Sequence, residues 1–195
     1  KEVGLETLLQ AENFMEGYHL PVAHKATVGA WFAPNKTVFP DQSYDSFTYQ
    51  TFAKTHAARY GQAHPDNTRL TGEWRNTSIL PTVFPTHMYV LAPDHLWYLS
   101  VRRRGVGAVD VRFGVAIAPE VDAMLTDTAE RAAWIRDLVA FFEHVNGEDR
   151  HVVEGIYAGS RSSFASPGQL SWLEREIHDF QKYLAQRLAP DTQRG

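Results

Sequence analysis

Apolar and polar side chains alternate along much of the middle of the chain, which is the pattern of strands that bury one face. The alternation is strict over residues 109–117, and short turn-forming stretches such as Pro93-Asp94 and 105–107 separate the apolar runs. We therefore expect four strands, over residues 47–51, 82–91, 96–103 and 109–117. Because the turns between the last three are short, these strands should form an antiparallel meander.

The spacing of apolar residues becomes helical further along the chain. They recur every three or four positions from Ile135 to Val145, which predicts an amphipathic helix. Asn146-Gly147 predicts the end of that helix, and a second helical segment should begin at Glu148-Asp149.

A last helix should open at Ser171 and Glu174, which have the spacing of a capping box, and end at Pro190. Its apolar stripe consists of Leu173, Ile177, Phe180, Leu184 and Leu188. A curved antiparallel sheet wrapped around a long C-terminal helix predicts an α+β fold of the helix-grip (START-like, SRPBCC) type. Such a fold encloses an apolar cavity between helix and sheet, which is a ready ligand site.

The length of 195 residues predicts a single domain over residues 1–195 with one substantial core. Residues 1–11 fit either a helix or a short buried strand. Residues 25–45 are loop-like and rich in aromatic side chains, so they form either a loop packed over the core or the wall or lid of a pocket. Residues 55–68 are polar and predict a long loop.

The composition excludes several classes of function. The chain has no cysteine, so any metal must be held by His, Asp or Glu. A net charge of −4 gives no electrostatic case for binding nucleic acid or an anionic membrane. There is neither an apolar run long enough to span a bilayer nor the apolar core of a signal peptide, and a cytoplasmic protein is expected. Since the sequence does not begin with Met, we expect a fragment or a processed product.

The most concentrated candidate chemistry surrounds the first pair of histidines. His19 and His24 lie five residues apart, and on one unbroken α-helix their imidazoles would diverge by about 140°. Pro21 disfavours a helical conformation of the residue before it, so the helix should end near His19 and leave His24 on the following turn. Glu12 and Glu16 would then share a helix face with His19. Acids and two histidines in this arrangement suit a metal better than an apolar core.

A carboxylate is predicted on the apolar face of the second helical segment. Asp149, Val153 and Ile156 follow helical spacing, and an unpaired carboxylate buried there would cost several kcal/mol. Asp149 must therefore cap the helix, form an ion pair or bind a metal. Its position alone favours an N-cap, because Asp is a good first residue for a helix.

A second pair of histidines, His144 and His151, is an alternative metal site. These residues lie seven apart and could share one face of a continuous helix. The predicted break at Asn146-Gly147 and the lack of an evident third ligand make this pair the weaker candidate. A chance pair is also expected in a chain with nine histidines.

Three motifs follow one another along the chain. They read E-N-x-x-E-x-Y-H-x4-H over residues 12–24, E-D-x4-E over residues 148–154 and G-x-L-S-x-x-E-x5-F over residues 168–180. Together they resemble the catalytic domain of the large (α) subunit of Rieske non-haem iron oxygenases, the ring-hydroxylating family. The first motif is specific to that family and the other two support it.

This resemblance implies a metal centre. His19, His24 and Asp149 match the family's facial triad for Fe(II), in which two imidazoles and one carboxylate leave the opposite face of the metal open. The cap interpretation of Asp149 then gives way to a ligand. By the same resemblance, Asn13 and Tyr18 orient the ligands from outside the coordination sphere.

The resemblance also assigns a catalytic role to Glu16. It matches the family's bridging acid, which links the iron site to the Rieske 2Fe–2S cluster of a neighbouring subunit. A homotrimer and a Rieske domain with its reductase are therefore the expected partners.

Two departures from the family pattern limit what can be carried over. The Rieske domain, which holds its cluster with two Cys and two His, is absent from this sequence, so these residues cannot supply their own electrons. The chain is then a domain of a longer subunit, which we favour, or works with a separate donor, or has lost turnover. In addition, Tyr157 stands where many relatives have Gln, which weakens any inference about the substrate.

The expected function is that of a non-haem Fe(II) oxygenase domain that uses O2 to hydroxylate or demethylate a small organic substrate. The substrate class stays open between aromatic and quaternary ammonium compounds, because the aromatic side chains of residues 31–49 suit both. Mono- and dioxygenation stay equally open. The alternative function is a helix-grip module that binds a small ligand without redox chemistry.

Overall fold

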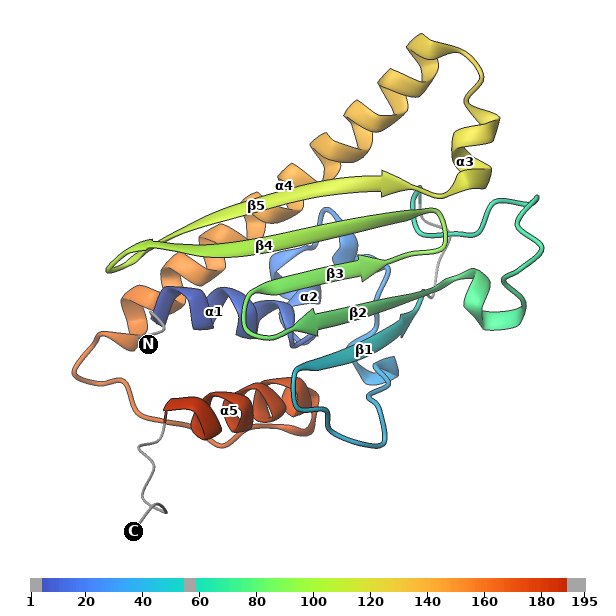
Figure 1. Cartoon of the computed structure of the whole chain (residues 1–195). Helices are drawn as coiled ribbons and strands as arrows, with labels where there is room; N and C mark the ends of the chain where they lie inside the picture. The colour runs from blue at the N-terminus through green and yellow to red at the C-terminus, as the bar shows by residue number, and fades with distance from the viewer. Residues whose placement is uncertain (1–4, 55–58, 189–195) are drawn as a thin grey trace.

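The computed structural model describes residues 5–54 and 59–188 (Figure 1). The α-helices are α1 (Leu5–Phe14), α2 (Leu20–Ala23), α3 (Pro119–Met124), α4 (Thr128–Ser160) and α5 (Arg175–Leu188). The strands are β1 (Phe47–Ala53), β2 (Thr77–Val83), β3 (His87–Leu91), β4 (His95–Gly105) and β5 (Ala108–Ile117). They form one antiparallel sheet in the order of the chain. Within the described residues, no helix is long and apolar enough to cross a membrane.

The core lies between the sheet and the helices α1 and α4, which cover one face of it (Figure 1). The indole of Trp97 in β4 is stacked on Phe142 of α4, with ring centroids 4.5 Å apart. Leu99 and Val101 of β4 and Leu138 of α4 are buried in the same cluster. The alternating burial along β4 confirms the face that the sequence pattern predicts for this strand.

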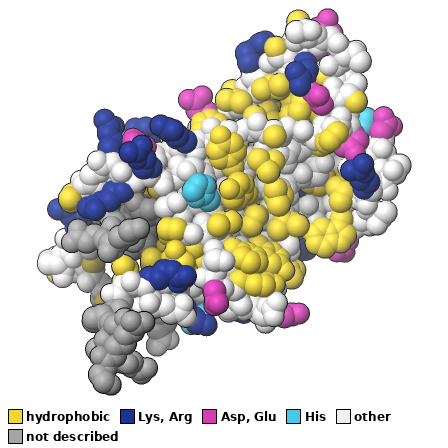
Figure 2. Space-filling view, in the orientation of Figure 1, with side chains coloured by type: hydrophobic (Ala, Val, Ile, Leu, Met, Phe, Trp, Pro, Cys, Tyr) yellow, Lys and Arg dark blue, Asp and Glu magenta, His cyan; other side chains and the backbone are white. Residues whose placement is uncertain are grey.

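The other face of the sheet is not covered by these helices. Figure 2 shows apolar side chains gathered over the sheet on this face. Val83, Leu91 and Tyr98 are among the exposed large apolar residues of these strands. The sheet therefore carries apolar side chains on both faces. For this reason the alternation of apolar and polar residues in the sequence identifies the buried face only in some strands.

The strand predictions are confirmed for residues 47–51, 96–103 and 109–117, which lie within β1, β4 and β5. The prediction of one strand over residues 82–91 is wrong, because two strands, β2 and β3, meet there in a hairpin. Pro81 lies in the middle of β2 opposite Tyr49, although proline has no N–H to donate and is rare inside sheets.

The predicted end of a helix at Asn146-Gly147 is also wrong. α4 runs unbroken for 33 residues, and its N-cap is Asp127, whose Oδ1 accepts hydrogen bonds from the N–H groups of Ala129 and Glu130. A glycine inside a helix costs only about 1 kcal/mol relative to alanine. Burial of Leu138, Phe142, Val145 and Val153 along the same helix outweighs that cost.

The mixed helical and antiparallel architecture is confirmed, but the long helix is not the last one. α4 crosses the sheet, whereas α5 has 14 residues and lies against β1 (Figure 1). The capping box that opens the last helix is present, with Ser171 and Glu174 bonded reciprocally. Residues 59–71 contain no helix or strand, as expected of a loop, while residues 55–58 and Pro190 lie outside the described residues.

Candidate metal centre

Helix α1 ends at Phe14, so the prediction that it continues to His19, with Glu12, Glu16 and His19 on one face, is wrong. After the end of α1, the Glu16 carboxylate accepts the hydrogen bonds that backbone carbonyls would accept in a longer helix. Its Oε2 accepts hydrogen bonds from the backbone N–H groups of Tyr18 (2.8 Å) and His19 (3.2 Å). These N–H groups would otherwise donate to carbonyls of the preceding turn.

His19 and His24 flank the single helical turn α2. His19 is its N-cap and His24 its C-cap, and Pro21 stands in the first turn, where its missing N–H is tolerated. This turn brings together two imidazoles that one straight helix would separate. Their ring centroids are 5.2 Å apart.

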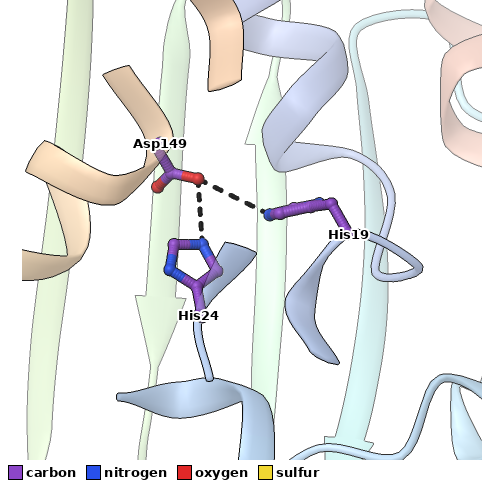
Figure 3. Close-up of side chains that lie close together, drawn as sticks. All are labelled: His19, His24 and Asp149. Carbon is purple, nitrogen blue, oxygen red and sulfur yellow. Dashed lines mark hydrogen bonds and ion pairs between the residues drawn. The ribbon is translucent and has the colours of Figure 1, made fainter. Parts of the chain in front are cut away.

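Asp149 of α4 completes the cluster (Figure 3). Its Oδ1 lies 2.9 Å from Nε2 of His24 and 3.5 Å from Nε2 of His19. One ligand atom from each of the three residues lies within 4.8 Å of the other two. Because Asp149 is in the interior of α4, the N-cap interpretation of this residue is wrong. We refer to His19, His24 and Asp149 as the triad.

The imidazole of His24 is fixed from its other side by Glu148. Nδ1 of His24 lies 2.7 Å from Oε2 of Glu148, which also accepts a hydrogen bond from the Thr27 hydroxyl (2.6 Å). A histidine whose second nitrogen faces a carboxylate presents Nε2 as a basic and oriented ligand. The sequence motif contains Glu148 but gave no sign of this contact.

His19 and Asp149 are held in the same way. Nδ1 of His19 is bonded to the Glu16 carboxylate, and Nδ2 of Asn13 donates to Oδ1 of Asp149 at 2.8 Å. Glu16 and Asn13 are both buried. Each member of the triad therefore has a polar neighbour that limits its rotation.

The charges of the triad are strongly coupled. Burial alone would lower the pKa of His19, but hydrogen bonds to Asp149 and Glu16 outweigh it and raise this pKa to about 9. Burial alone would raise the pKa of Asp149, but the two imidazoles lower it to about 2. The carboxylates thus favour positive charge at this point, and a divalent cation could replace the protons on the imidazoles.

A cavity of about 80 Å³ opens beside the triad. All three triad residues line it, together with the aromatic side chains Phe14, Trp31, Phe32, Phe52, Trp97 and Phe142. One water needs roughly 10–15 Å³ by this kind of measure, so the cavity suits a small molecule. Trp31 and Phe32 come from the aromatic loop at residues 25–45, which forms a wall of the cavity.

Gly29 allows the chain after His24 to pass close to α2. A Cβ atom at Gly29 would lie 2.3 Å from the carbonyl oxygen of Leu20 and 2.7 Å from that of His24. The backbone N–H of Gly29 donates to the same His24 oxygen at 2.9 Å. This close approach positions His24, and only a glycine permits it.

Tyr18 is placed less directly than the triad. Its side chain is 48% exposed, and its hydroxyl lies 3.4 Å from Oε1 of Glu174, not against a triad side chain. Burial and the neighbouring acids raise the pKa of Tyr18 to about 12. Its contact with the site runs through its backbone N–H and Glu16, so its orienting role remains a prediction.

His144 and His151 do not form a comparable cluster. Nε2 of His144 lies 3.7 Å from Oε1 of Glu148, and the His144 side chain is 65% exposed. In the part of the chain that the structure describes, the triad is the group of three His, Asp or Glu residues with ligand atoms this close together.

The chain matches a known protein family over most of its length. A family model described as "Ring hydroxylating alpha subunit (catalytic domain)" matches residues 9–190. Among curated proteins, no sequence matches this chain.

Two solved structures share the fold. One is the quaternary ammonium Rieske monooxygenase CntA in complex with an inhibitor, with a TM-score of 0.61 and 16% identity. The other is a quaternary ammonium Rieske monooxygenase studied for carnitine oxidation by gut microbiota and for inter-subunit electron transfer, with a TM-score of 0.64 and 17% identity. Both comparisons cover 92% of this chain but only 45% and 46% of the solved chains. The chain thus spans less than half the length of either, and identities this low show the fold alone.

Proposed function

The chain belongs to the family of ring hydroxylating alpha subunit catalytic domains, and on that premise we propose that His19, His24 and Asp149 hold Fe(II). Two imidazoles and one carboxylate are the donor set typical of non-haem Fe(II) oxygenases. The observation that carries this proposal is the convergence of the three ligand atoms within 4.8 Å beside a small cavity.

The proposed activity is that of a Rieske-type mono- or dioxygenase acting on a small organic molecule by hydroxylation or demethylation. When bound, the iron would supply the centre at which O2 is activated. Asn13, Glu16 and Glu148 would hold the three metal ligands in place. The aromatic side chains that line the cavity would exclude water from the substrate. Glu148 and Glu16 hold His24 and His19 in the tautomer that leaves each Nε2 free to bind.

The electrons would come from a Rieske 2Fe–2S cluster outside these residues, because the 195 residues contain no cysteine. We assign Glu16 the bridging role between that cluster and His19, and we propose a homotrimer in which a neighbouring subunit brings the cluster close. Glu16, Tyr18 and His19 line an open groove with α4 on the outer side of the triad, which supports such an approach.

The helix-grip type remains our proposal for the fold, with α4 as the gripped helix and the cavity between helices and sheet in support. We also propose a cytoplasmic location. The family match disfavours the alternative of a binding module without redox chemistry.

The test is anaerobic loading with Fe(II) followed by metal analysis of the desalted protein. We expect one iron per chain, and His19→Ala or Asp149→Ala should remove most of it. His151→Ala, an exposed histidine on the same helix as Asp149, is the matched control and should retain the iron. Equal iron content in folded wild-type protein and both triad variants would refute the assignment.

A further inference from the structure

The floor of the cavity is built from a row of side chains across the sheet. Phe52 of β1 is paired with Ser78 of β2, and the register continues the row through Ala92 to His95 of β4. All four residues line the cavity. The next row includes the pair Val90 and Trp97, which also line it.

Three polar atoms of these rows have no hydrogen-bond partner among the described residues. They are Oγ of Ser78, Nε2 of His95 and Nε1 of Trp97. The three residues are only 1%, 6% and 6% exposed. A buried polar atom without a partner typically costs about 1–3 kcal/mol, so a polar ligand group that reached these atoms, all in residues that line one cavity, would recover part of that cost.

The cavity lining also contains a cation, the ammonium of Lys54. Lys54, directly after β1, lines it, and its Nζ donates to the backbone carbonyl of Tyr60 at 2.5 Å. Gly61 leaves room for this ammonium, since a Cβ there would lie 1.4 Å from Nζ. Burial lowers the pKa of Lys54 to about 8, although Asp94 opposes this shift. The side chain is therefore still charged at neutral pH, in a largely aromatic surrounding.

Asp94 fixes the orientation of the His95 imidazole. Its Oδ1 lies 2.7 Å from Nδ1 of His95, and its Oδ2 accepts from the backbone N–H of Gly61 at 2.6 Å. Burial alone would raise the pKa of Asp94, but His95, Gly61 and Lys54 together lower it. Asp94 is thus a charged anchor that accepts from Nδ1–H of His95, which leaves Nε2 of the neutral imidazole as a hydrogen-bond acceptor.

We infer that the substrate carries a carboxylate or similar anionic group, which binds at Lys54, Ser78 and Trp97. An ammonium, a hydroxyl and an indole N–H are three donors, which suits the acceptor oxygens of an acid. The apolar part of the substrate would then occupy the rest of the cavity, which the triad also lines. This inference rests on the proposed function, because it names the substrate class of the same site.

The same arrangement disfavours a quaternary ammonium substrate. The aromatic rings that could hold such a cation, Trp31 and Phe32, already face Nζ of Lys54, at 5.3 and 5.8 Å from their ring centroids. A second positive charge placed against these two rings would be repelled by the Lys54 ammonium, whereas the carboxylates of Glu16 and Asp149 line the cavity at the triad. Lys54 therefore argues against a cationic group beside Trp31 and Phe32 in this chain.

The test compares ligands of matched shape and different charge on the metal-free chain at pH 7, by isothermal titration calorimetry. The probes are benzoate with benzamide, acetate with acetamide, and phenyltrimethylammonium. At least one acid should bind roughly tenfold or more tightly than its amide, as expected for one charge-assisted contact. Phenyltrimethylammonium should not bind. Lys54→Met should remove the preference for the acid, Ser78→Ala should weaken it, and Lys36→Met, at an exposed lysine, should leave it unchanged.

Several results would overturn the inference: binding of neither acid, an amide bound as tightly as its acid, binding of the cation, or an unchanged preference in Lys54→Met. Because the metal is left out, a carboxylate cannot bind through iron. The iron content is measured separately on the same variants, and Lys54→Met should keep it. A chain that prefers acids but binds no iron would refute the proposed function and leave the anion site standing.

Discussion

Nδ1 of His24 lies 2.7 Å from Oε2 of Glu148, the residue that immediately precedes Asp149. One turn of α4 therefore supplies both a triad carboxylate and the acid that orients a triad imidazole. Because of this contact, a disturbance of α4 near Glu148 would also change the position of His24 at the end of α2.

Glu148→Ala should weaken metal binding without removing it. Loss of the acid that fixes a metal-bound histidine typically reduces metal affinity by about 10–100-fold. Titration with Co(II) as a stable substitute for Fe(II) measures the change. Glu143→Ala, at an exposed acid five residues earlier on α4, is the control and should bind as the wild type does. Equal affinities of Glu148→Ala and wild type would show that the His24 contact has no role in the site.

Glu16→Gln separates orientation from electron transfer. The amide keeps the size of the side chain and one oxygen, but it loses the charge and the second acceptor. The amide cannot keep every Glu16 contact with the backbone N–H groups and with Nδ1 of His19, so the melting temperature and the iron affinity should fall in part. Turnover should be lost completely in an assembly that includes a Rieske domain and reductase. In the 195-residue chain alone, wild type and variant should be equally inactive with NADH and reductase. Multiple turnovers by that chain would contradict the proposed source of the electrons.

Gly147→Ala tests the continuity of α4. A Cβ at this position would meet no atom within 4 Å, and alanine is favoured over glycine inside a helix by about 1 kcal/mol. The variant should therefore be more stable in urea denaturation by up to about that amount. Gly155→Ala, also within α4 and free of contacts, should behave alike. A loss of stability in Gly147→Ala alone would restore the helix break that the sequence suggests.

The metal-free chain should have a pH-dependent stability set by its triad. The pKa of His19 is raised from 6.5 to about 9, so its stabilising contribution is complete below pH 6.5 and is lost as the pH rises through about 9. The pKa of Asp149 is lowered from 3.8 to about 2, so its contribution is present above pH 3.8 and is lost as the pH falls through about 2.

Melting temperatures between pH 6 and 9.5 measure the His19 part of this dependence. The wild type should lose stability over that range, and His19→Gln should lose less. Metal binding should show the opposite trend, because the metal displaces the proton of His19, so its apparent affinity should rise between pH 6.5 and 9. A melting temperature that is flat in wild type and variant alike would contradict the charge coupling described for the triad.

The sequence predicts which three side chains come together better than it predicts the path of the chain around them. His19, His24 and Asp149 stand out through spacing, a helix-breaking Pro21 and the family motif. The backbone that joins them differs from the prediction, because Glu16 ends α1 early and because packing of α4 outweighs the local preference of Gly147. Local signals describe single residues, while the continuity of a helix depends on contacts from distant strands.

The cavity floor could not be predicted for the same reason. Ser78 and His95 fall in one row only through the register of β2, β3 and β4, whereas the pattern predicted a single strand over residues 82–91. No sequence motif includes Lys54. Its role in the cavity is seen only in the structure, where its Nζ lies over the ring of Trp31. Its charge changes the expected substrate class, which residues 31–49 left open.

The most direct test of the iron site is an anomalous difference map collected at the iron edge from crystals soaked anaerobically in Fe(II). We expect one dominant peak per chain, in contact with Nε2 of His19, Nε2 of His24 and the carboxylate of Asp149. A dominant peak between His144 and His151, with none at the triad, would contradict it.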